Sequence, residues 1–313
     1  MSDEPPVVAR GLVKRYGDVV AVDDVDLTVE AGDVYGYLGP NGAGKTTSLR
    51  MLLGLIRPTS GTAHLFGRDP LVDGARALDG VAGFVEGPRF YPYLSGRKTL
   101  ELLADYDGRG ARLRIDEVLD LVELRDRARH RVGGYSHGMR QRLGIAASLI
   151  RDPRLLLLDE PATGLDPAGM RDMRDLVRRL AGEGITVLLS SHLLAEVEEL
   201  CNRVAIIRKG RILYEGSLAR LLETASESYR LRALEPERAR LLCLAQSGLD
   251  DVVLDGDEVV FRAGEQAVAD LSVALGQARI PFTALVPSTT SLEELFLGMT
   301  EGEPDERPAE AVA

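Results

Sequence analysis

The stretch "GYLGPNGAGKTTSLRMLLGL", residues 36–55, decides which fold this chain adopts. The apolar and aromatic run 34–38 predicts a short buried strand, residues 39–44 predict a glycine-rich loop, and a helix is expected from Thr46 onward. The inner face of that helix is expected to carry Leu49, Leu52, Leu53 and Ile56. Strand, loop and helix in this order are typical of an α/β domain.

The loop follows the spacing of a phosphate-binding loop (P-loop), with Gly39, four further residues and then Gly44-Lys45-Thr46. In such a loop, backbone N–H groups surround a β-phosphate, the lysine reaches the β- and γ-phosphate oxygens, and the threonine hydroxyl ligates Mg²⁺. A chance glycine-rich turn would lack the flanking strand and helix. The pattern therefore predicts a nucleoside triphosphate site, without indicating which machine the triphosphate drives.

A second stretch, "RLLLLDEPATGLD" at residues 154–166, supplies the carboxylates that such a site needs. The leucines at 155–158 predict a strand buried on both faces, which ends in Asp159 and Glu160 at the sheet edge where α/β proteins bind ligands. Asp159 is expected to hold Mg²⁺, directly or through water, and Glu160 to polarise the attacking water as general base. Alone, these residues are an ordinary charged strand end, and the P-loop favours the catalytic interpretation.

Two further residues are candidates from their positions. The run 185–189 predicts another buried strand, and His192 near its tip is able to hydrogen-bond a γ-phosphate. Alternating residues in 12–29 predict two strands joined by a Gly-Asp turn. Tyr16 beside that turn is able to stack on a base, but a tyrosine is equally at home in any strand.

The stretch "YSHGMRQRLGIAASLI", residues 135–150, predicts a helix with an ordinary apolar face and a polar start. Because a helix N-terminus carries unpaired N–H groups and partial positive charge, Ser136 with a nearby glycine suits a bound anion. Taken alone, Ser136 is better explained as a plain N-cap. The anion has to come from the rest of the chain.

Length and composition narrow the class of protein. A chain of 313 residues suits one large and one small domain, and 45% hydrophobic with 28% charged residues is typical of a soluble globular protein. The net charge of −11, without a Lys/Arg cluster, argues against nucleic-acid binding. The longest uncharged stretch, 280–292, is too short to span a membrane. The acidic start predicts no secretory signal, and the isolated Cys201 and Cys243 suit a reducing cytosol.

Together these motifs closely resemble those of the ATP-binding cassette (ABC) ATPases, over residues 7–217. The resemblance implies an α/β P-loop NTPase fold of ABC type, with a mixed sheet core, an antiparallel β subdomain and an α-helical subdomain at about residues 87–150. It also implies ATP and Mg²⁺ as cofactors. Two copies of the chain are expected to form a homodimer around two ATP molecules.

The resemblance assigns roles to individual positions. The expected ATP contacts are Tyr16, Gly39, Pro40, Asn41, Gly42, Ala43, Gly44, Lys45, Thr46 and Thr47, together with Ser136, His137 and Gly138 acting on the ATP of the other subunit. The expected Mg²⁺ positions are Thr46, Glu86 and Asp159, and the catalytic ones are Lys45, Glu160 and His192. Asp166 stands in the loop that crosses the dimer interface.

Two positions depart from the family pattern. The usual signature Leu-Ser-Gly-Gly-Gln reads Tyr-Ser-His-Gly-Met at residues 135–139, which keeps the backbone donors and the helix dipole, so anion recognition should persist. His137 either strengthens phosphate binding or faces solvent. Glu86 replaces the usual Gln; its carboxylate can ligate Mg²⁺ or hold water, yet it brings negative charge toward a polyphosphate. Its context resembles exporters of peptide antibiotics such as bacitracin and lantibiotics.

The resemblance implies the ATPase subunit of an exporter of a drug, antibiotic peptide or lipid-like substrate, as in bacitracin or daunorubicin exporters. Its partner would be an ABC-2 type membrane permease at the cytoplasmic face of a bacterial membrane, contacted by Phe90, Tyr91 and Tyr93 unless these aromatic rings are simply buried. The alternatives are an ABC ATPase acting on ribosomes or DNA, and an ATP-binding sensor. The single cassette without a long insertion and the intact catalytic positions argue against them.

After Ser217 these motifs stop, and residues 218–300 predict a small accessory domain. The pattern gives a strand at 229–234, a helix at 236–245, two strands within 252–261, a helix at 265–278 and a strand at 282–286. This order suggests a ferredoxin-like α+β domain. A closing helix is expected within 288–300, with Ser291 as its cap and Glu294 three residues on, similar to the closing helix of the same exporters. Residues 1–6 are expected to be flexible and 301–313 disordered.

Overall fold

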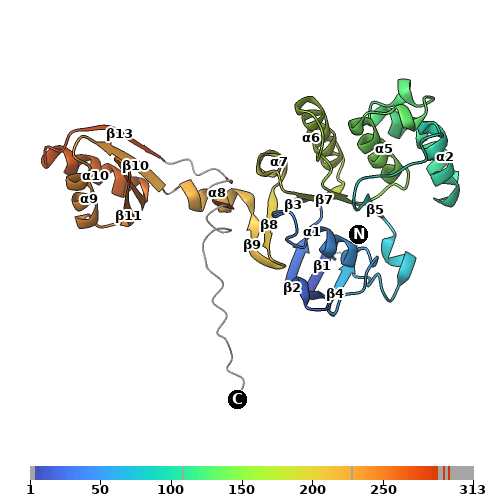
Figure 1. Cartoon of the computed structure of the whole chain (residues 1–313), viewed down its shortest axis with the longest axis horizontal. Coiled ribbons are helices and arrows are strands. Elements are labelled where there is room, and N and C mark those ends of the chain that lie inside the picture. Colours follow the sequence, from blue (N-terminus) through green and yellow to red (C-terminus); the bar gives the residue numbers. More distant parts are fainter. Residues whose placement is uncertain (1–3, 108, 227, 288–291, 293–294, 297–313) are drawn as a thin grey trace, which may run out of the picture. The chain divides into compact units, whose positions relative to one another are not determined.

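The structure, a computed structural model, describes residues 4–107, 109–226, 228–287, 292, 295 and 296. The chain forms two compact units, and the boundary between them falls between Ser217 and Leu218 (Figure 1). No helix within the described residues is both long enough and apolar enough to cross a membrane. Residues 1–3, the proposed cap residues Ser291 and Glu294, and the expected tail 301–313 lie outside the described residues.

A six-stranded sheet forms the centre of the first unit, in the order β5-β6-β7-β3-β8-β9. All neighbours are parallel except β8 and β9. The strands are β3 (Val34–Leu38), β5 (Val81–Phe84), β6 (Leu155–Asp159), β7 (Thr186–Ser191), β8 (Arg203–Arg208) and β9 (Arg211–Ser217). The three predicted buried strands are thus neighbours, and since parallel strands end at one edge, the loops after β3, β6 and β7 meet there.

A three-stranded antiparallel sheet, in the order β2-β1-β4, packs with the central sheet around one core. Its strands are β1 (Val7–Tyr16), β2 (Val19–Val29) and β4 (Ser60–Leu65). Gly61 permits the close approach of β4 to β1, because its φ is +85° and a Cβ would lie 2.1 Å from the carbonyl oxygen of Gly11. The core joins Val7, Leu27 and Leu65 of this sheet to Tyr35 and Leu157 of the central one.

Ten helices and three short 3₁₀ segments are seen in the described residues. In the first unit they are α1 (Lys45–Leu52), η1 (Gly74–Leu78), α2 (Gly96–Asp107), α3 (Arg109–Leu113), α4 (Ile115–Leu121), η2 (Arg125–Arg127), η3 (Val132–Gly134), α5 (His137–Leu149), α6 (Pro167–Gly182) and α7 (Leu194–Leu200). Helices α2 to α5 lie within the stretch in which the sequence predicts a helical subdomain (Figure 1).

Helix α1 ends earlier than its apolar pattern suggests. Leu53 is the C-cap rather than a helical residue, and Ile56 packs on the core from beyond the helix. Gly54, with φ +67°, turns the chain: its N–H donates to the oxygen of Met51, and the N–H of the following residue donates to that of Arg50. These two bonds form a Schellman motif, so Gly54 is the stop signal that the leucine pattern obscured.

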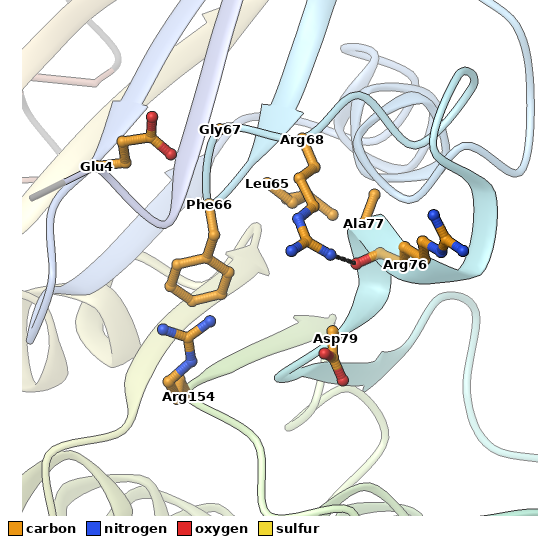
Figure 2. A pocket seen from close by; sticks show the side chains of 9 residues that line it. All are labelled: Glu4, Leu65, Phe66, Gly67, Arg68, Arg76, Ala77, Asp79 and Arg154. Atoms are coloured by element: carbon orange, nitrogen blue, oxygen red, sulfur yellow. Dashed lines mark hydrogen bonds between the residues drawn. The ribbon is translucent and has the colours of Figure 1, made fainter. Parts of the chain in front are cut away.

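The amino end of β6 is anchored beside a pocket of 290 Å³ (Figure 2). The guanidinium of Arg154 lies over the ring of Phe66, 3.9 Å from its centroid, while the backbone N–H of Arg154 donates to the oxygen of Gly80 at 2.8 Å. The lining residues are Glu4, Leu65, Phe66, Gly67, Arg68, Arg76, Ala77, Asp79 and Arg154. These contacts fix the start of the strand whose other end carries the predicted catalytic carboxylates.

The second unit contains a four-stranded antiparallel sheet in the order β11-β12-β10-β13, with two helices on one face. Its elements are α8 (Leu218–Ser226), β10 (Ser228–Ala233), α9 (Pro236–Ala245), β11 (Leu249–Asp255), β12 (Glu258–Ala263), α10 (Glu265–Gln277) and β13 (Phe282–Pro287). The order of strands and helices from β10 to β13 is the predicted one. Leu292, Leu295 and Phe296 are helical, whereas the rest of the expected closing helix lies outside the described residues.

We expect Phe261→Ala to unfold the second unit selectively. The Phe261 ring is fully buried and stacks on Tyr229 with centroids 6.0 Å apart, so its removal leaves a cavity that should cost about 3–5 kcal/mol of unfolding free energy. Urea titration followed by circular dichroism and hydrogen exchange measures the loss. Val286→Ala, at a half-exposed position in the same sheet, is the matched control and should change stability by less than about 1 kcal/mol. Equal losses would contradict this account of the core.

Candidate active site

The loop between β3 and α1 has a conformation that only glycines allow at two positions. A Cβ on Gly39 would lie 2.4 Å from the oxygen of Ile207, and one on Gly44, whose φ is +110°, would lie 2.5 Å from the oxygen of Ala21. The loop is therefore pressed against neighbouring backbone on two sides, which sets the direction in which α1 begins. The remaining predicted loop positions, Pro40, Asn41, Gly42 and Ala43, lie between these glycines, and Thr46 and Thr47 lie in the first turn of α1. The first N–H groups of a helix have no intrahelical partner, so they are available to an anion.

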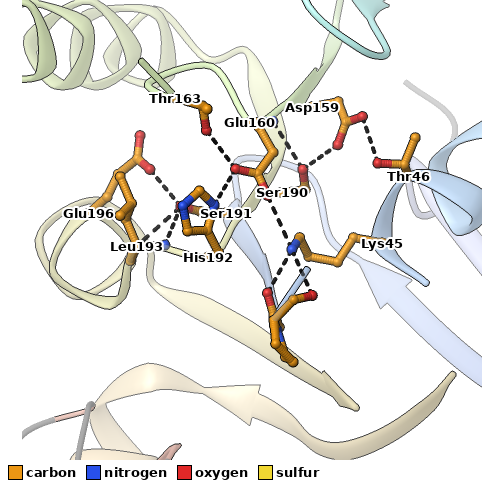
Figure 3. A network of polar contacts seen from close by, with 12 residues as sticks. Lys45, Thr46, Asp159, Glu160, Thr163, Ser190, Ser191, His192, Leu193 and Glu196 are labelled. Carbon is orange, nitrogen blue, oxygen red and sulfur yellow. Dashed lines mark hydrogen bonds and ion pairs between the residues drawn. The ribbon is translucent and has the colours of Figure 1, made fainter. Parts of the chain in front are cut away.

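Lys45 is buried at the base of this loop, with 5% of its surface exposed. Its Nζ donates to the oxygens of Gly39 at 2.6 Å and Pro40 at 3.3 Å, and forms an ion pair with Glu160 Oε1 at 3.1 Å (Figure 3). A buried cation is tolerable only with such partners. The structure thus joins the P-loop lysine directly to the predicted general base.

Asp159 lies at the carboxyl end of β6 and is almost fully buried. Its Oδ1 accepts a hydrogen bond from Ser190 Oγ at 2.5 Å, and its Oδ2 accepts from Thr46 Oγ1 at 3.0 Å (Figure 3). Oδ2 also accepts from the backbone N–H of Glu86 at 3.1 Å. The predicted pair Thr46 and Asp159 is therefore in contact. Ser190, which sequence reasoning did not single out, orients this carboxylate.

Glu160 is held in the left-handed backbone region, with φ +52°, at the point where β6 ends. Its backbone N–H donates to Ser190 Oγ at 3.0 Å, and its carboxylate accepts from Thr163 Oγ1 at 2.6 Å and contacts His192 Nδ1 at 2.5 Å. Burial raises the pKa of this carboxyl, but the Thr163 hydrogen bond, the Lys45 charge and the His192 contact together hold the pKa below its ordinary value. Glu160 is therefore ionised at neutral pH, as a general base must be.

Hydrogen bonds of Ser191 with Glu196 and Leu193 stabilise the turn that carries His192. Ser191 Oγ donates to Glu196 Oε2 at 2.7 Å and accepts from the N–H of Leu193 at 3.0 Å. Burial raises the pKa of Glu196, while the Ser191 hydrogen bond opposes that effect. Both residues were missed in the sequence because hydroxyls at a strand end and an acid in a following helix are unremarkable there.

The side chains of two further predicted site residues do not join the cluster. The Glu86 carboxylate is paired with Arg50, so only its backbone N–H reaches Asp159. Tyr16 ends β1 with 49% of its surface exposed, and Lys14 Nζ lies 5.0 Å from its ring centroid. The ring is accessible for stacking, and no hydrogen bond or ion pair seen in the described residues connects it to the carboxylates.

The start of α5 is exposed and capped. Ser136 is its N-cap, and its side chain accepts from the N–H of Met139 at 3.2 Å, which confirms the N-cap interpretation. Gly138 lies against Leu165, to which a Cβ would come within 3.4 Å. Asp166 caps α6 by accepting from the N–H of Gly169 at 2.9 Å. The predicted roles of Ser136 and Asp166 in a dimer remain predictions.

The donor set of Thr46 and Asp159 fits Mg²⁺, which prefers oxygen ligands and usually keeps positions for phosphate oxygens. In the described part of the chain, no group of three or more His, Cys, Asp or Glu side chains is arranged to hold a metal by itself. A magnesium ion here would therefore be bound jointly by protein and nucleotide. The site as a whole brings together hydrogen-bond donors for a phosphate, an ionised carboxylate and an imidazole at one sheet edge.

Comparison with known proteins gives one consistent family. A family model described as ABC transporter matches residues 22–163. The chain is 38% identical over 304 residues to an uncharacterised ABC transporter ATP-binding protein, YdbJ, of Bacillus subtilis, covering 97% of this chain and 98% of the relative. It is 38% identical to the bacitracin transport ATP-binding protein BcrA of Bacillus licheniformis, covering 93% and 96% of the two chains. It is 39% identical to the daunorubicin resistance ATP-binding protein DrrA3 of Streptomyces coeruleorubidus, covering 94% and 95%.

Solved structures agree with the sequence relatives. The ATP-binding subunit of an ABC transporter superposes with a TM-score of 0.63 at 27% identity, covering 70% of this chain and 92% of the other. A dimeric ATP-binding cassette in a post-hydrolysis state, bound to ADP and phosphate, superposes with a TM-score of 0.61 at 25% identity, covering 68% and 98%.

We expect Glu160→Gln to stop ATP turnover while leaving ATP binding intact, because it removes the base but keeps the phosphate-binding loop. The rate should fall by about 10²–10⁴-fold, the range that a general base contributes. Phosphate release measures turnover, and size-exclusion chromatography with ATP should show an accumulated dimer. Glu198→Gln, an exposed acid on α7, is the control and should turn over normally. Hydrolysis near the wild-type rate would refute the role of Glu160.

We expect Lys45→Ala to lose nucleotide affinity, because no other lysine in the described loop replaces its charge-assisted contacts to two phosphates. Losing about 1.5–3 kcal/mol of such contacts weakens binding roughly 10- to 100-fold. Calorimetric titration with ATP measures the change. Lys98→Ala, on the exposed face of α2, is the control. Unchanged affinity in the Lys45 variant would contradict the P-loop assignment.

Proposed function

This chain belongs to the family of ABC transporter ATP-binding proteins, and from that premise we propose that it hydrolyses ATP to energise export through a separate membrane subunit. The observation that carries the proposal is the cluster in which Lys45, Thr46, Asp159, Glu160 and His192 meet at one sheet edge. Its relatives named for bacitracin transport and daunorubicin resistance support a drug or antibiotic peptide as cargo. A lipid-like substrate is equally compatible with an exporter of this kind.

Each member of the cluster has a distinct task in the proposed reaction. Backbone N–H groups of residues 39–46 and the Lys45 ammonium bind the phosphates. Glu160, ionised in this network, accepts a proton from the attacking water, and His192 hydrogen-bonds the γ-phosphate from the β7 tip. The exposed Tyr16 ring stacks on the adenine.

We assign Mg²⁺ to Thr46 and Asp159, which already share a hydrogen bond. When bound, the ion neutralises phosphate charge. Glu86 contributes its backbone N–H to Asp159 here, and its carboxylate becomes a metal or water ligand only by releasing Arg50.

The ATP-bound form is proposed to be a homodimer. In it, the capped start of α5, with Ser136, His137 and Gly138, faces the ATP held by the other subunit, and Asp166 lies at the dimer interface. The post-hydrolysis cassette among the structural neighbours is dimeric, which supports a dimeric form of this chain. The exposure of Ser136 and His137 leaves them accessible to a partner.

The proposed partner is an ABC-2 type permease at the cytoplasmic face of a bacterial membrane. We place its contact site in a largely apolar cleft of 440 Å³ between β5 and α5. The cleft is lined by residues that include Phe84, Pro88, Phe90 and Gly144. Tyr91 and Tyr93, more than 60% exposed with ring centroids 5.5 Å apart, are further contact candidates. Such exposed aromatics are typical of interaction surfaces.

The second unit is proposed to be a ferredoxin-like accessory domain. The sheet order β11-β12-β10-β13, read with two helices between the strands, supports that assignment. The alternative functions, a ribosome- or DNA-acting ATPase or a sensor, have no support in the relatives. The acidic composition likewise gives no reason to expect a nucleic-acid partner.

We expect Ser136→Arg to abolish hydrolysis by crowding the partner's γ-phosphate, while the monomer stays folded and binds ATP through its own P-loop. A role limited to capping predicts instead a loss of about 0.5–2 kcal/mol in stability, with activity lost only through unfolding. Melting temperature, ATP binding and phosphate release separate these two cases.

Mixing the Ser136→Arg chain with a Lys45→Ala chain tests action across the dimer. One composite site would carry both defects and the other none, so activity should partly recover although neither variant works alone. A wild-type and mutant mixture is the control for whether one intact site suffices. No recovery in verified heterodimers, alongside activity in that control, would exclude action across the dimer.

A further inference from the structure

His137, which stands where the family usually has glycine, has a definite partner in this structure. It is the first residue of α5, and its Nε2 lies 2.9 Å from the carbonyl oxygen of Thr163. Because a carbonyl oxygen can only accept, this imidazole nitrogen carries the hydrogen and donates it. The side chain therefore does not simply face solvent.

Thr163 is also the residue that holds the catalytic carboxylate. Its Oγ1 donates to Glu160 Oε2 at 2.6 Å, and its backbone N–H donates to the oxygen of Glu160 at 3.2 Å. The two bonds close the turn from Glu160 to Thr163. Gly164, with φ +76°, follows at once, and a Cβ there would lie 3.4 Å from the imidazole, so the absent side chain leaves room for the ring.

We propose that His137 is a positioning residue that ties the start of α5 to the turn that orients Glu160 of the same chain. This inference rests on the proposed function, in which the start of α5 faces the partner's ATP. His137 then links the surface that senses one nucleotide to the base that acts on the other. The glycine of the usual signature has no side chain with which to make this link.

The competing role, direct phosphate binding by the imidazole, has less support. The Nε2–H group of His137 is already used by Thr163, so a phosphate would have to break that bond. The backbone donors of the helix start remain available without such an exchange. The two roles also differ in which chain of a dimer they affect, and an experiment can separate them.

The first test is a double-mutant cycle with Thr163→Val, which removes the hydroxyl that reaches Glu160 and keeps the side-chain shape. His137→Phe keeps a ring but loses the donor, whereas His137→Gln keeps a donor. We expect His137→Phe to lower kcat by about 2- to 10-fold, the effect of one lost hydrogen bond, without changing ATP affinity. His137→Gln should restore most of the rate. In the Thr163→Val background, His137→Phe should have little further effect.

His130→Phe is the matched control, since this exposed histidine also lies in the helical region and, in the described residues, its side chain has no hydrogen-bond or ion-pair partner. It should leave kcat unchanged. Any of three results would overturn the inference. His137→Phe could hydrolyse ATP at the wild-type rate, or His137→Gln could be no faster than His137→Phe. In the third, the fall in kcat of the double variant would equal the product of the falls in the two single variants. Circular dichroism melts identify any variant whose rate falls through unfolding.

The second test uses heterodimers in which one chain carries Glu160→Gln and the other keeps Glu160. His137→Phe is added either to the chain with Glu160→Gln or to the opposite chain. When both changes are in one chain, the active Glu160 belongs to the wild-type chain, and its own His137 is intact. The rate should then equal that of the heterodimer with Glu160→Gln alone. When they are in opposite chains, the rate should fall. The reverse pattern would show that His137 acts on the partner's ATP and would overturn the inference.

The two proposals can fail separately. If the wild-type chain does not hydrolyse ATP, or if Glu160→Gln leaves hydrolysis unchanged, the proposed function fails and this inference fails with it. If the wild-type chain is active and Glu160→Gln is inactive, but His137→Phe hydrolyses ATP normally, only this inference fails.

Discussion

The register in which β6, β7 and β3 pair is the constraint on which the site depends. Asp159 lies opposite Ser190, and Leu38 lies opposite Ser191, so the three loops that follow leave the sheet at one edge. Shifting β6 by one residue would turn Asp159 to the other face of the sheet and remove it from Thr46. The four leucines of β6 are interchangeable in such a shift, so its two ends oppose it: the N–H groups of Arg154 and Leu155 donate to the oxygen of Gly80, and Asp159 is held by Thr46 and Ser190.

Within that frame, the proposed function makes Lys45 the connection between phosphate binding and the state of Glu160. An ammonium group has three hydrogens, and those of Lys45 face the oxygens of Gly39, Pro40 and Glu160. In the proposed function, a phosphate that reaches Lys45 would therefore compete with these three partners for its hydrogens. Of the three partners, only Glu160 is an anion, so it is the one that a phosphate would displace from Lys45. Once displaced, its carboxylate would be able to accept a hydrogen bond from water. In the proposed reaction, this ion pair would hold the Glu160 carboxylate until a phosphate takes its place beside Lys45.

Much of this site could be predicted from the sequence because buried parallel strands read as continuous apolar runs and the P-loop has a fixed spacing. The contacts of the serines and acids could not. Ser190 and Ser191 look like any strand end until β6 is placed beside Ser190, and Glu196 looks like any helix surface residue until α7 is placed beside Ser191. The pairing of Glu86, which follows β5, with Arg50 of α1 joins segments distant in sequence and turns a predicted ligand away. The end of α1 was hidden by the apolar pattern, which continues beyond Gly54 in Leu55 and Ile56.

The backbone of Glu160 explains why so many contacts converge on one residue. A non-glycine residue in the left-handed region costs on the order of 1–3 kcal/mol and persists only where its surroundings over-determine it. Here Ser190 holds its backbone, while Lys45, Thr163 and His192 hold its carboxylate. A glycine would relieve the strain but lose the carboxylate and its contacts. The network therefore has two effects, because the contacts that keep Glu160 ionised also help to hold its backbone in the left-handed region.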